Sequence, residues 1–151
     1  MTPKFRGFRK DGKGWVEGYY WRDNTNGKHK ITSDLSDDNF VCHEIHPESL
    51  AMSTGLTDKH GKEIFGSIPI DGVMSKGGSV LKTDLGVLHY TSQKWDVVFM
   101  FGAFQMLSPL QKLPISFVFH AWDAMQNDVI KHESEYTNHI EIIGNQYESN
   151  G

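Results

Sequence analysis

The sequence predicts a mainly β protein: a single domain of antiparallel hairpins that form a small barrel or a sandwich-like core, with one or two short helices. Short segments rich in aromatic and β-branched residues recur along the chain, and turn-forming Gly, Asn and Asp residues separate them. The chain has 151 residues, which suits one domain, and its nine Phe, five Tyr and four Trp supply large side chains for a core. Because no repeat, heptad or linker divides the sequence, residues 1–151 are predicted to form one unit.

The N-terminal part of the chain predicts two successive hairpins. Residues 5–9 and 15–21 are strands on either side of a glycine-bearing turn. Asn26-Gly27 suits the positive φ angles of the next turn, and residues 28–32 then form a short returning strand.

A loop and a further strand follow. Residues 33–39 are polar and acidic, which predicts a loop. Residues 40–45 predict a strand that ends before Pro47, because proline has no amide to donate to a β-ladder. For residues 48–52, periodicity does not distinguish one helical turn from extended chain.

Residues 54–65 carry the densest turn chemistry of the chain and predict a hairpin. Asp58 can accept a hydrogen bond from the backbone N–H two residues further on, and Gly61 supplies the positive φ of a turn followed by a bulge. Leu56 and Phe65 flank the turn as apolar anchors, and the turn presents Lys59 and His60 to solvent.

The glycine-rich segment 66–79 predicts an irregular surface loop. Gly77-Gly78-Ser79 within it lacks the Gly-Lys-Ser/Thr of a phosphate-binding loop, so we interpret it as a turn.

The second half of the chain predicts more strands. Residues 85–90 and 95–101 form a hairpin, and the apolar run 97–101 does not alternate, which predicts burial on both sides or a subunit contact. Residues 107–114 contain two prolines and should be irregular. Residues 115–120 predict a strand with Phe117 and Phe119 on one face. The remaining predictions are a short helix at 121–127, a final strand at 136–143 and a turn at Gly144-Asn145.

The charge distribution bears on nucleic-acid binding. The net charge is −4, whereas proteins that neutralise duplex phosphates usually show a basic surplus. Basic residues, including Lys4 and Arg6, do gather near the N-terminus, and Trp15, Tyr19 and Trp21 follow at period two along a strand. These aromatic side chains could stack the bases of a single strand, but the packed face of a sheet is the favoured interpretation because large aromatics dominate burial in small β domains.

Catalytic and metal-binding patterns are weak. Cys42 is the one cysteine, so no disulfide forms within the chain, and we interpret it as a small buried hydrophobe. His132, Glu135 and His139 leave a metal-dependent hydrolase as a third hypothesis. No Gly-x-Ser-x-Gly motif is present, and we assign no catalytic residue, no metal ligand and no cofactor.

The first residues lack an apolar signal core, and no run reaches the length of a membrane span. The sequence therefore predicts a cytoplasmic protein without a membrane partner.

Three separated blocks resemble the YopX family of phage and prophage proteins. They are residues 3–8 with Gly18-Tyr19-Tyr20, residues 54–65, and residues 140–148, in the order of the family. The chain departs from the family pattern after the central block, where Pro69 predicts a shortened or replaced strand.

The resemblance implies a mostly β fold, phage or prophage origin and self-association, and it offers no enzymatic activity to carry over. It also implies that the matched residues determine the fold; these are Gly55, Leu56, Asp58, Gly61, Gly144 and Asn145.

Our leading hypothesis is a non-catalytic, oligomeric protein of a mobile element, which acts in the bacterial cytoplasm through contacts with itself or with an unknown host or phage protein. The alternative is a nucleic-acid accessory protein whose surface comprises Lys4, Arg6, Trp15, Tyr19 and Trp21.

Overall fold

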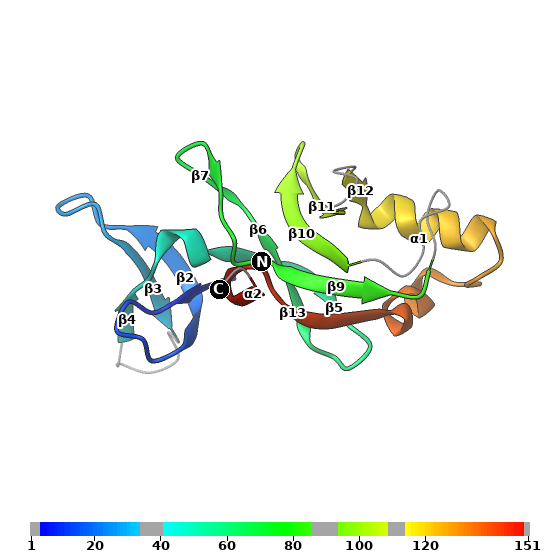
Figure 1. The fold of residues 1–151 in the computed structure, drawn as a ribbon, viewed down its shortest axis with the longest axis horizontal. Helices are drawn as coiled ribbons and strands as arrows, with labels where there is room; N and C mark the ends of the chain where they lie inside the picture. Colours follow the sequence, from blue (N-terminus) through cyan, green and yellow to red (C-terminus); the bar gives the residue numbers. More distant parts are fainter. Residues whose placement is uncertain (1–3, 34–40, 86–93, 109–113, 150–151) are drawn as a thin grey trace.

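The computed structural model describes residues 4–33, 41–85, 94–108 and 114–149. Its architecture confirms the mainly β prediction, because the described residues form an eleven-stranded sheet and a separate two-stranded sheet, with few and short helices. Figure 1 shows the N-terminal strands at one end of the molecule and the longest helix at the other.

The predicted N-terminal hairpins are present. Phe5 pairs with Gly18 and Phe8 with Trp15 in the first hairpin, and Tyr20 pairs with Ile31 in the second. The elements are β1 (Phe5–Phe8), β2 (Trp15–Arg22), β3 (His29–Ser33), β4 (Val41–Glu44) and the 3-10 helix η1 (Pro47–Ser49). The predicted loop at 33–39 lies outside the described residues except for Ser33, which ends β3.

The central hairpin is confirmed. It joins β5 (Ala51–Thr57) to β6 (Glu63–Ser67), and Gly61 has a φ of 78° in the turn. Gly55, with a φ of 79°, lies where the register between the two strands shifts, which is the behaviour of a β-bulge.

The prediction of an irregular surface loop at 66–79 is wrong. This segment contains β7 (Pro69–Ile70) and β8 (Val73–Met74), which pair as a small hairpin, and it leads into β9 (Ser79–Thr83) of the main sheet. Gly72 lies in the β7–β8 turn with a φ of 82°, whereas Gly77 and Gly78 permit close backbone packing. A Cβ atom on Gly77 would lie 1.9 Å from the Ser49 carbonyl oxygen, and one on Gly78 would lie 2.4 Å from that of Val97.

The predicted pairing of residues 95–101 with 85–90 is also wrong. Strand β10 (Lys94–Met100) pairs with β11 (Ala103–Leu107) across a two-residue turn, in which Phe101 and Gly102 both have positive φ. Leu85 is in no strand, and 86–90 lie outside the described residues. The burial predicted for 97–101 holds for Val97 and Val98, whereas Phe99 and Met100 are only partly buried and Phe101, in the turn, is 86% exposed.

The predicted strand at 115–120 is a helix for most of its length. Strand β12 (Pro114–Ser116) ends at once in α1 (Phe117–Gln126), and the Ser116 side chain caps the helix by accepting a hydrogen bond from the Phe119 N–H. Phe117 is therefore buried while Phe119 is exposed, and the two do not share a face. The helix expected at 121–127 is present but starts earlier.

The C-terminal strand begins later than predicted, and Gly144-Asn145 is not a turn. The 3-10 helix η2 (Glu133–His139) precedes β13 (Ile140–Asn145), and the short helix α2 (Gln146–Ser149) follows it. Gly144 and Asn145 pair with Val80 and Ser79 of β9. The register shifts between Ile142 and Gly144, so the glycine follows a β-bulge and not a turn.

The main sheet is open among the strands described. Its order is β12-β11-β10-β6-β5-β1-β2-β3-β4, with β9 pairing both β10 and β13, so the two ends of this path do not meet in a barrel. The β10–β6 pair is parallel and the other pairs are antiparallel.

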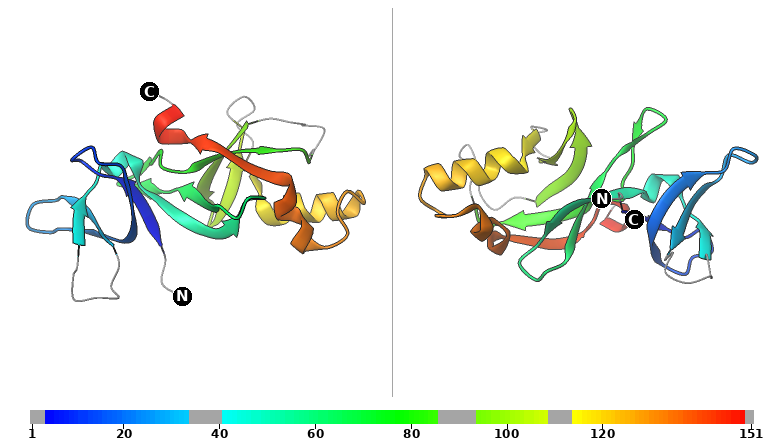
Figure 2. Two further views of the ribbon diagram at one scale, coloured as in Figure 1. Left: turned by 90° about the horizontal axis from the view of Figure 1, so that it is seen from below. Right: turned by 180° about the vertical axis from the view of Figure 1, so that it is seen from behind.

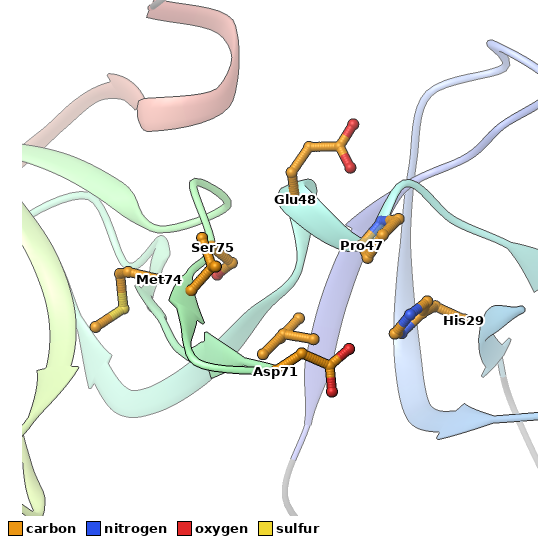
Figure 3. A pocket seen from close by; sticks show the side chains of 8 residues that line it. His29, Pro47, Glu48, Asp71, Met74 and Ser75 are labelled. Atoms are coloured by element: carbon orange, nitrogen blue, oxygen red, sulfur yellow. The ribbon is translucent and has the colours of Figure 1, made fainter. Parts of the chain in front are cut away.

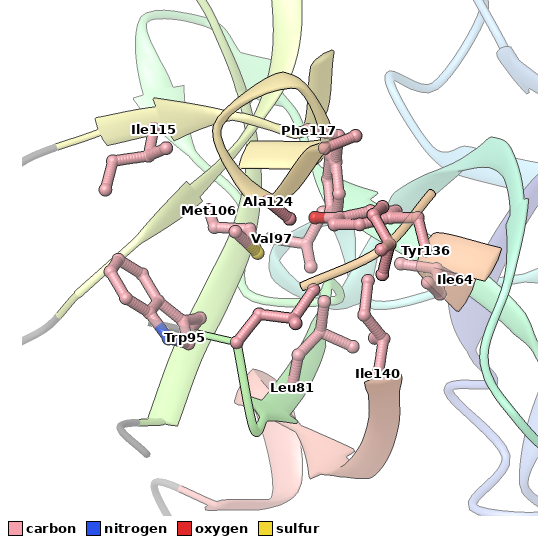
Figure 4. Packing of buried hydrophobic residues seen from close by; sticks show 13 residues of the cluster. Ile64, Leu81, Trp95, Val97, Met106, Ile115, Phe117, Ala124, Tyr136 and Ile140 are labelled. Atoms are coloured by element: carbon pink, nitrogen blue, oxygen red, sulfur yellow. The ribbon is translucent and has the colours of Figure 1, made fainter. Parts of the chain in front are cut away.

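Figure 2 shows the N-terminal strands at one end of the molecule and α1 at the other. Each of these two parts has its own cluster of buried hydrophobic residues. The larger cluster packs the inner side of α1, including Phe117 and Ala124, against Leu81, Val97 and Ile140 from the strands (Figure 4). The smaller cluster, under β1–β4, contains Val16, Ile31, Ile45 and Leu50.

Candidate functional site

Asp58 organises the contact between the central hairpin and β13. Its Oδ1 atom accepts hydrogen bonds of 2.9 Å from both the His60 and Lys62 N–H groups, and its Oδ2 atom accepts one of 3.0 Å from the Ile142 N–H. The Lys59 N–H donates to the Ile140 carbonyl at 2.8 Å. The Asp58 turn is therefore fastened to a strand more than eighty residues further along the chain.

The electrostatics of Asp58 match this geometry. Burial by itself would raise the pKa of this carboxyl, but the three backbone N–H donors outweigh burial, and the net result is a lowered pKa. The charged carboxylate is thus the form that the fold stabilises.

The structure brings together the other residues predicted to determine the fold. Leu56 packs against the larger hydrophobic cluster. Gly144 and Asn145 lie on β13, the strand whose earlier part receives the Asp58 turn, and the Asn145 side chain accepts a hydrogen bond of 2.8 Å from the Glu148 N–H. The central and closing blocks that resemble the family therefore touch each other through Asp58. The first block touches both of them, through Lys4 with Glu63 and Phe8 with Tyr147.

Gln146 was missed by the sequence reasoning. It is buried, and its side-chain amide bonds the Ser67 hydroxyl at 2.9 Å and the Val97 carbonyl at 3.0 Å. A glutamine just after a strand is an ordinary polar residue in sequence, so no local pattern distinguishes it.

Lys4 and Arg6, predicted as surface cations, have partners within the protein. Lys4 forms ion pairs with Glu17 at 3.2 Å and Glu63 at 2.7 Å. The Arg6 guanidinium lies 5.0 Å from the Trp15 ring centroid and 4.5 Å from that of Phe65. Arg6 also donates two hydrogen bonds to the Gly77 carbonyl.

The predicted aromatic stripe divides into two parts. Trp15 belongs to a cluster of rings with Phe8 and Tyr147, and its Nε1–H donates to Glu148 at 2.8 Å. Tyr19 and Trp21 are 38% and 40% exposed, so the interpretation of the whole stripe as a packed face is wrong for these two.

Most described basic residues near the N-terminus are paired with carboxylates. The pairs are Lys4 with Glu17 and Glu63, Arg9 with Asp11, Lys10 and Lys28 with Glu44, Arg22 with Asp71, and Lys30 with Asp23. Lys30 also lies 5.2 Å from the Trp21 ring centroid. These carboxylates offset the positive potential that the sequence suggested.

The structure bears on the predictions for Cys42 and for a metal site. Cys42 is exposed and not a buried hydrophobe, because β4 has only partial cover. Within the described part of the chain, no three His, Cys, Asp or Glu side chains converge as a metal site would require. His139 instead bonds Asp84 at 2.8 Å. The described residues therefore provide no metal site for the hydrolase hypothesis, which rested on His132, Glu135 and His139.

A pocket of 220 Å³ lies between β3, η1 and the β7–β8 hairpin (Figure 3). His29 and Asp71 line it, but the His29 Nδ1 atom is bonded to the Tyr20 hydroxyl at 2.7 Å and Asp71 is paired with Arg22 at 3.1 Å. Burial lowers the pKa of His29, and the Arg22 charge acts in the same direction. The polar groups of this pocket are thus engaged in internal contacts.

Helix α1 is apolar on both of its sides. Phe117, His120, Ala121 and Ala124 face the core. The opposite side, here called the outer face of α1, consists of Val118, Phe119, Trp122 and Met125 and continues in Val129 beyond the helix. Val118 is 78% exposed and Trp122 is 54% exposed.

The fold is thus that of a mainly β protein, an open and largely antiparallel sheet with a helix whose outer face is apolar and exposed. Comparison with known proteins gives the family: the model of the YopX protein family matches residues 4–151, and the chain belongs to this family.

The fold also has a counterpart among solved structures. The crystal structure of protein EF1440 from Enterococcus faecalis is similar, with 21% sequence identity and a TM-score of 0.51 over 99% of this chain and 96% of that chain. This likeness shows a shared fold. No curated protein matches the sequence. Among the described residues, no helix is both long and apolar enough to cross a membrane.

Proposed function

We propose that this YopX-family protein is encoded by a phage or prophage and acts, without catalysing a reaction, by self-association through the outer face of α1 in the bacterial cytoplasm. The observation that carries the proposal is that this face consists of Val118, Phe119, Trp122 and Met125, all exposed.

A helix that is apolar all round is normally buried all round. Helix α1 has ten residues, of which Asp123 alone carries a formal charge, and it covers the core with one side only. Full burial of a large apolar side chain is worth roughly 1.5–3 kcal/mol relative to full exposure. Trp122 and Val118 lose part of this free energy because they remain in contact with water. A contact that covers the outer face recovers part of this free energy.

A second copy of the chain is the partner that this face fits best. The outer face has no charged side chain, so two copies related by a two-fold axis can meet without like-charge repulsion. Its five side chains offer on the order of 400–500 Å² per copy, against about 800 Å² in a typical stable interface. We therefore expect a reversible, concentration-dependent dimer.

The test is size-exclusion chromatography with light scattering over a wide range of protein concentrations. Trp122→Glu places a charge at the centre of the outer face and should weaken the association at least about tenfold. Val73→Glu is the matched control, because Val73 is 70% exposed on the distant β7–β8 hairpin. A wild type that is monomeric at every concentration contradicts self-association and leaves a host or phage protein as the partner.

The mobile-element origin has its own test. Transcription of the gene should rise when the resident prophage is induced, and an unchanged transcript level during induction contradicts this part of the proposal.

Nucleic-acid binding is the second candidate, and the half-exposed Tyr19 and Trp21 favour it. The paired N-terminal cations weaken its support, because little charge is left to neutralise phosphates. A salt-dependent mobility shift of single-stranded DNA that Trp21→Ala abolishes would support this candidate, and no shift at low salt would rule it out.

A further inference from the structure

The charged groups around Arg6 leave one positive charge without a carboxylate beside it. Arg9 and Arg22 each pair with an aspartate, whereas among the described residues no carboxylate lies within ion-pair distance of Arg6. Glu17, Glu148 and Glu63 act on Arg6 only through longer-range attraction. Arg6 is thus a cation that the fold holds between two aromatic rings and one carbonyl oxygen.

Arg6 retains hydrogen-bonding capacity. A guanidinium has five N–H donors, and the hydrogen bonds of Arg6 within the described residues use its Nε and Nη2 atoms on the same Gly77 oxygen. Arg6 Nη1 is not among the buried polar side-chain atoms that lack a hydrogen-bond partner; among the described residues, Arg9 Nε is the atom of that kind. The Arg6 Nη1 atom is therefore not sealed from solvent. Burial lowers the pKa of Arg6 to about 10, so the group remains a cation at neutral pH.

Arg6 lines a pocket of 290 Å³ together with Lys62, Glu63 and the Ile142–Asn145 part of β13. Lys62 is exposed and forms no ion pair with any residue that the structure describes. The charge of Glu63 is already balanced by Lys4 at 2.7 Å, and Ser53 donates a hydrogen bond to its other oxygen. Among the described residues, neither Arg6 nor Lys62 has a carboxylate within ion-pair distance, and Glu63 attracts Arg6 only at longer range.

We propose that this pocket binds a small organic oxyanion, with its carboxylate or phosphate group on Arg6 and Lys62 and its apolar part against Ile142 and Ile143. Guanidinium groups bind both kinds of oxyanion through charge-assisted, often bidentate hydrogen bonds. The volume lies at the lower limit of small-molecule sites, about 300–1,000 Å³, so the ligand is small. An anion there also offsets the desolvation that the half-buried guanidinium suffers.

The neighbouring pocket on β13 lacks this combination. It is lined by Lys59, Lys82, Asp84, His139 and Glu141, and there Lys59 pairs with Glu141 at 3.2 Å and His139 with Asp84 at 2.8 Å. Lys59 and Lys62 lie on the same turn but in different pockets, which provides a matched pair of variants.

The test is a ¹⁵N-amide NMR titration with inorganic phosphate and, separately, with butyrate, using chloride at equal ionic strength as the reference. At least one oxyanion should give saturable shifts centred on the amides of Lys62, Gly144 and Asn145. Tighter binding of phosphate identifies a phosphoester ligand, and tighter binding of butyrate identifies a carboxylate. Lys62→Ala should weaken binding about threefold, as expected for one partly exposed charge, and Lys59→Ala should not weaken it.

Arg6→Met should abolish the saturable shifts, and Lys62→Ala decides the question if Arg6→Met does not fold. Shifts that never saturate, that chloride reproduces, or that Lys59→Ala reduces as strongly as Lys62→Ala would overturn the proposal. The pocket and the outer face of α1 are built from different elements, so Trp122→Glu should leave anion binding unchanged. The anion site and self-association can therefore be tested independently.

Discussion

Asp58 shows how much one buried carboxylate can contribute to this fold. Asp58→Ala removes the acceptor of three backbone N–H groups and should lower the free energy of unfolding by about 2–3 kcal/mol. Asp11→Ala is the matched control, since Asp11 accepts a similar bond from the Lys13 N–H at an exposed turn and its loss should cost much less than that of Asp58. Urea unfolding of both variants measures the difference, and equal losses would contradict the role of Asp58.

The lowered pKa of Asp58 gives this effect a pH dependence. The carboxyl has a lower pKa in the folded protein than in the unfolded chain, so its stabilisation is complete above the ordinary carboxyl range and is lost as the pH falls through the folded pKa. The stability difference between wild type and Asp58→Ala should therefore shrink below about pH 4.

At this scale, sequence reasoning succeeded where a residue acts on its near neighbours. The bond from Asp58 to the N–H two residues on and the positive φ of Gly61 follow from local turn chemistry. The bond from Asp58 to Ile142, the stacking of Arg6 between Trp15 and Phe65, and the buried Gln146 depend on distant parts of the chain. No local pattern encodes these contacts.

Among the elements, α1 carries a second pH-dependent contact. The His120 Nδ1 atom is bonded to the Tyr136 hydroxyl at 2.7 Å, which ties α1 to η2. Burial lowers the pKa of His120 from 6.5 to about 4, so the unfolded chain binds the extra proton first as the pH falls. Stability should therefore decrease from about pH 6.5 to pH 4, by a total of about 3 kcal/mol.

His120→Gln should flatten this part of the stability profile, measured by urea unfolding at several pH values. His60→Gln, at an exposed position, should leave the profile as it is in the wild type. If the slope between pH 4 and 6.5 survives His120→Gln, the buried imidazole is not its source.

The errors of element prediction share one physical cause. Residues 115–120 are apolar without a decisive period, and the Ser116 cap together with the burial of Phe117, His120, Ala121 and Ala124 turns them into a helix. Strand β9 was missed because its entry, Gly77-Gly78, resembles a turn, whereas close approach to Ser49 and Val97 is what requires those glycines. Tertiary packing decided both elements.

At the scale of the whole molecule, the C-terminal residues join the two ends. Tyr147 stacks on Phe8 with ring centroids 5.6 Å apart and meets Trp15 edge-on at 5.8 Å, while its neighbour Gln146 bonds Ser67 and Val97. The short helix α2, directly after the predicted turn at Gly144-Asn145, therefore connects the N-terminal strands to the rest of the sheet.

Tyr147→Ala should loosen the N-terminal strands selectively, by about 2 kcal/mol, because its ring packs on that side. Hydrogen exchange should quicken for the amides of β2 and β3 and remain slow for those of β10 and β11. Glu148→Ala, which removes one exposed hydrogen bond to Trp15, is the milder comparison. Equal loss of protection in all four strands would mean that the sheet opens as one unit and that Tyr147 does not stabilise the N-terminal strands selectively.

Sedimentation equilibrium of the wild-type protein over a wide concentration range measures whether two copies associate, as the outer face of α1 leads us to expect. Self-association through this face predicts an average mass that rises with concentration toward twice the 17.2 kDa of the chain. A mass that stays at that of a single chain throughout would contradict it.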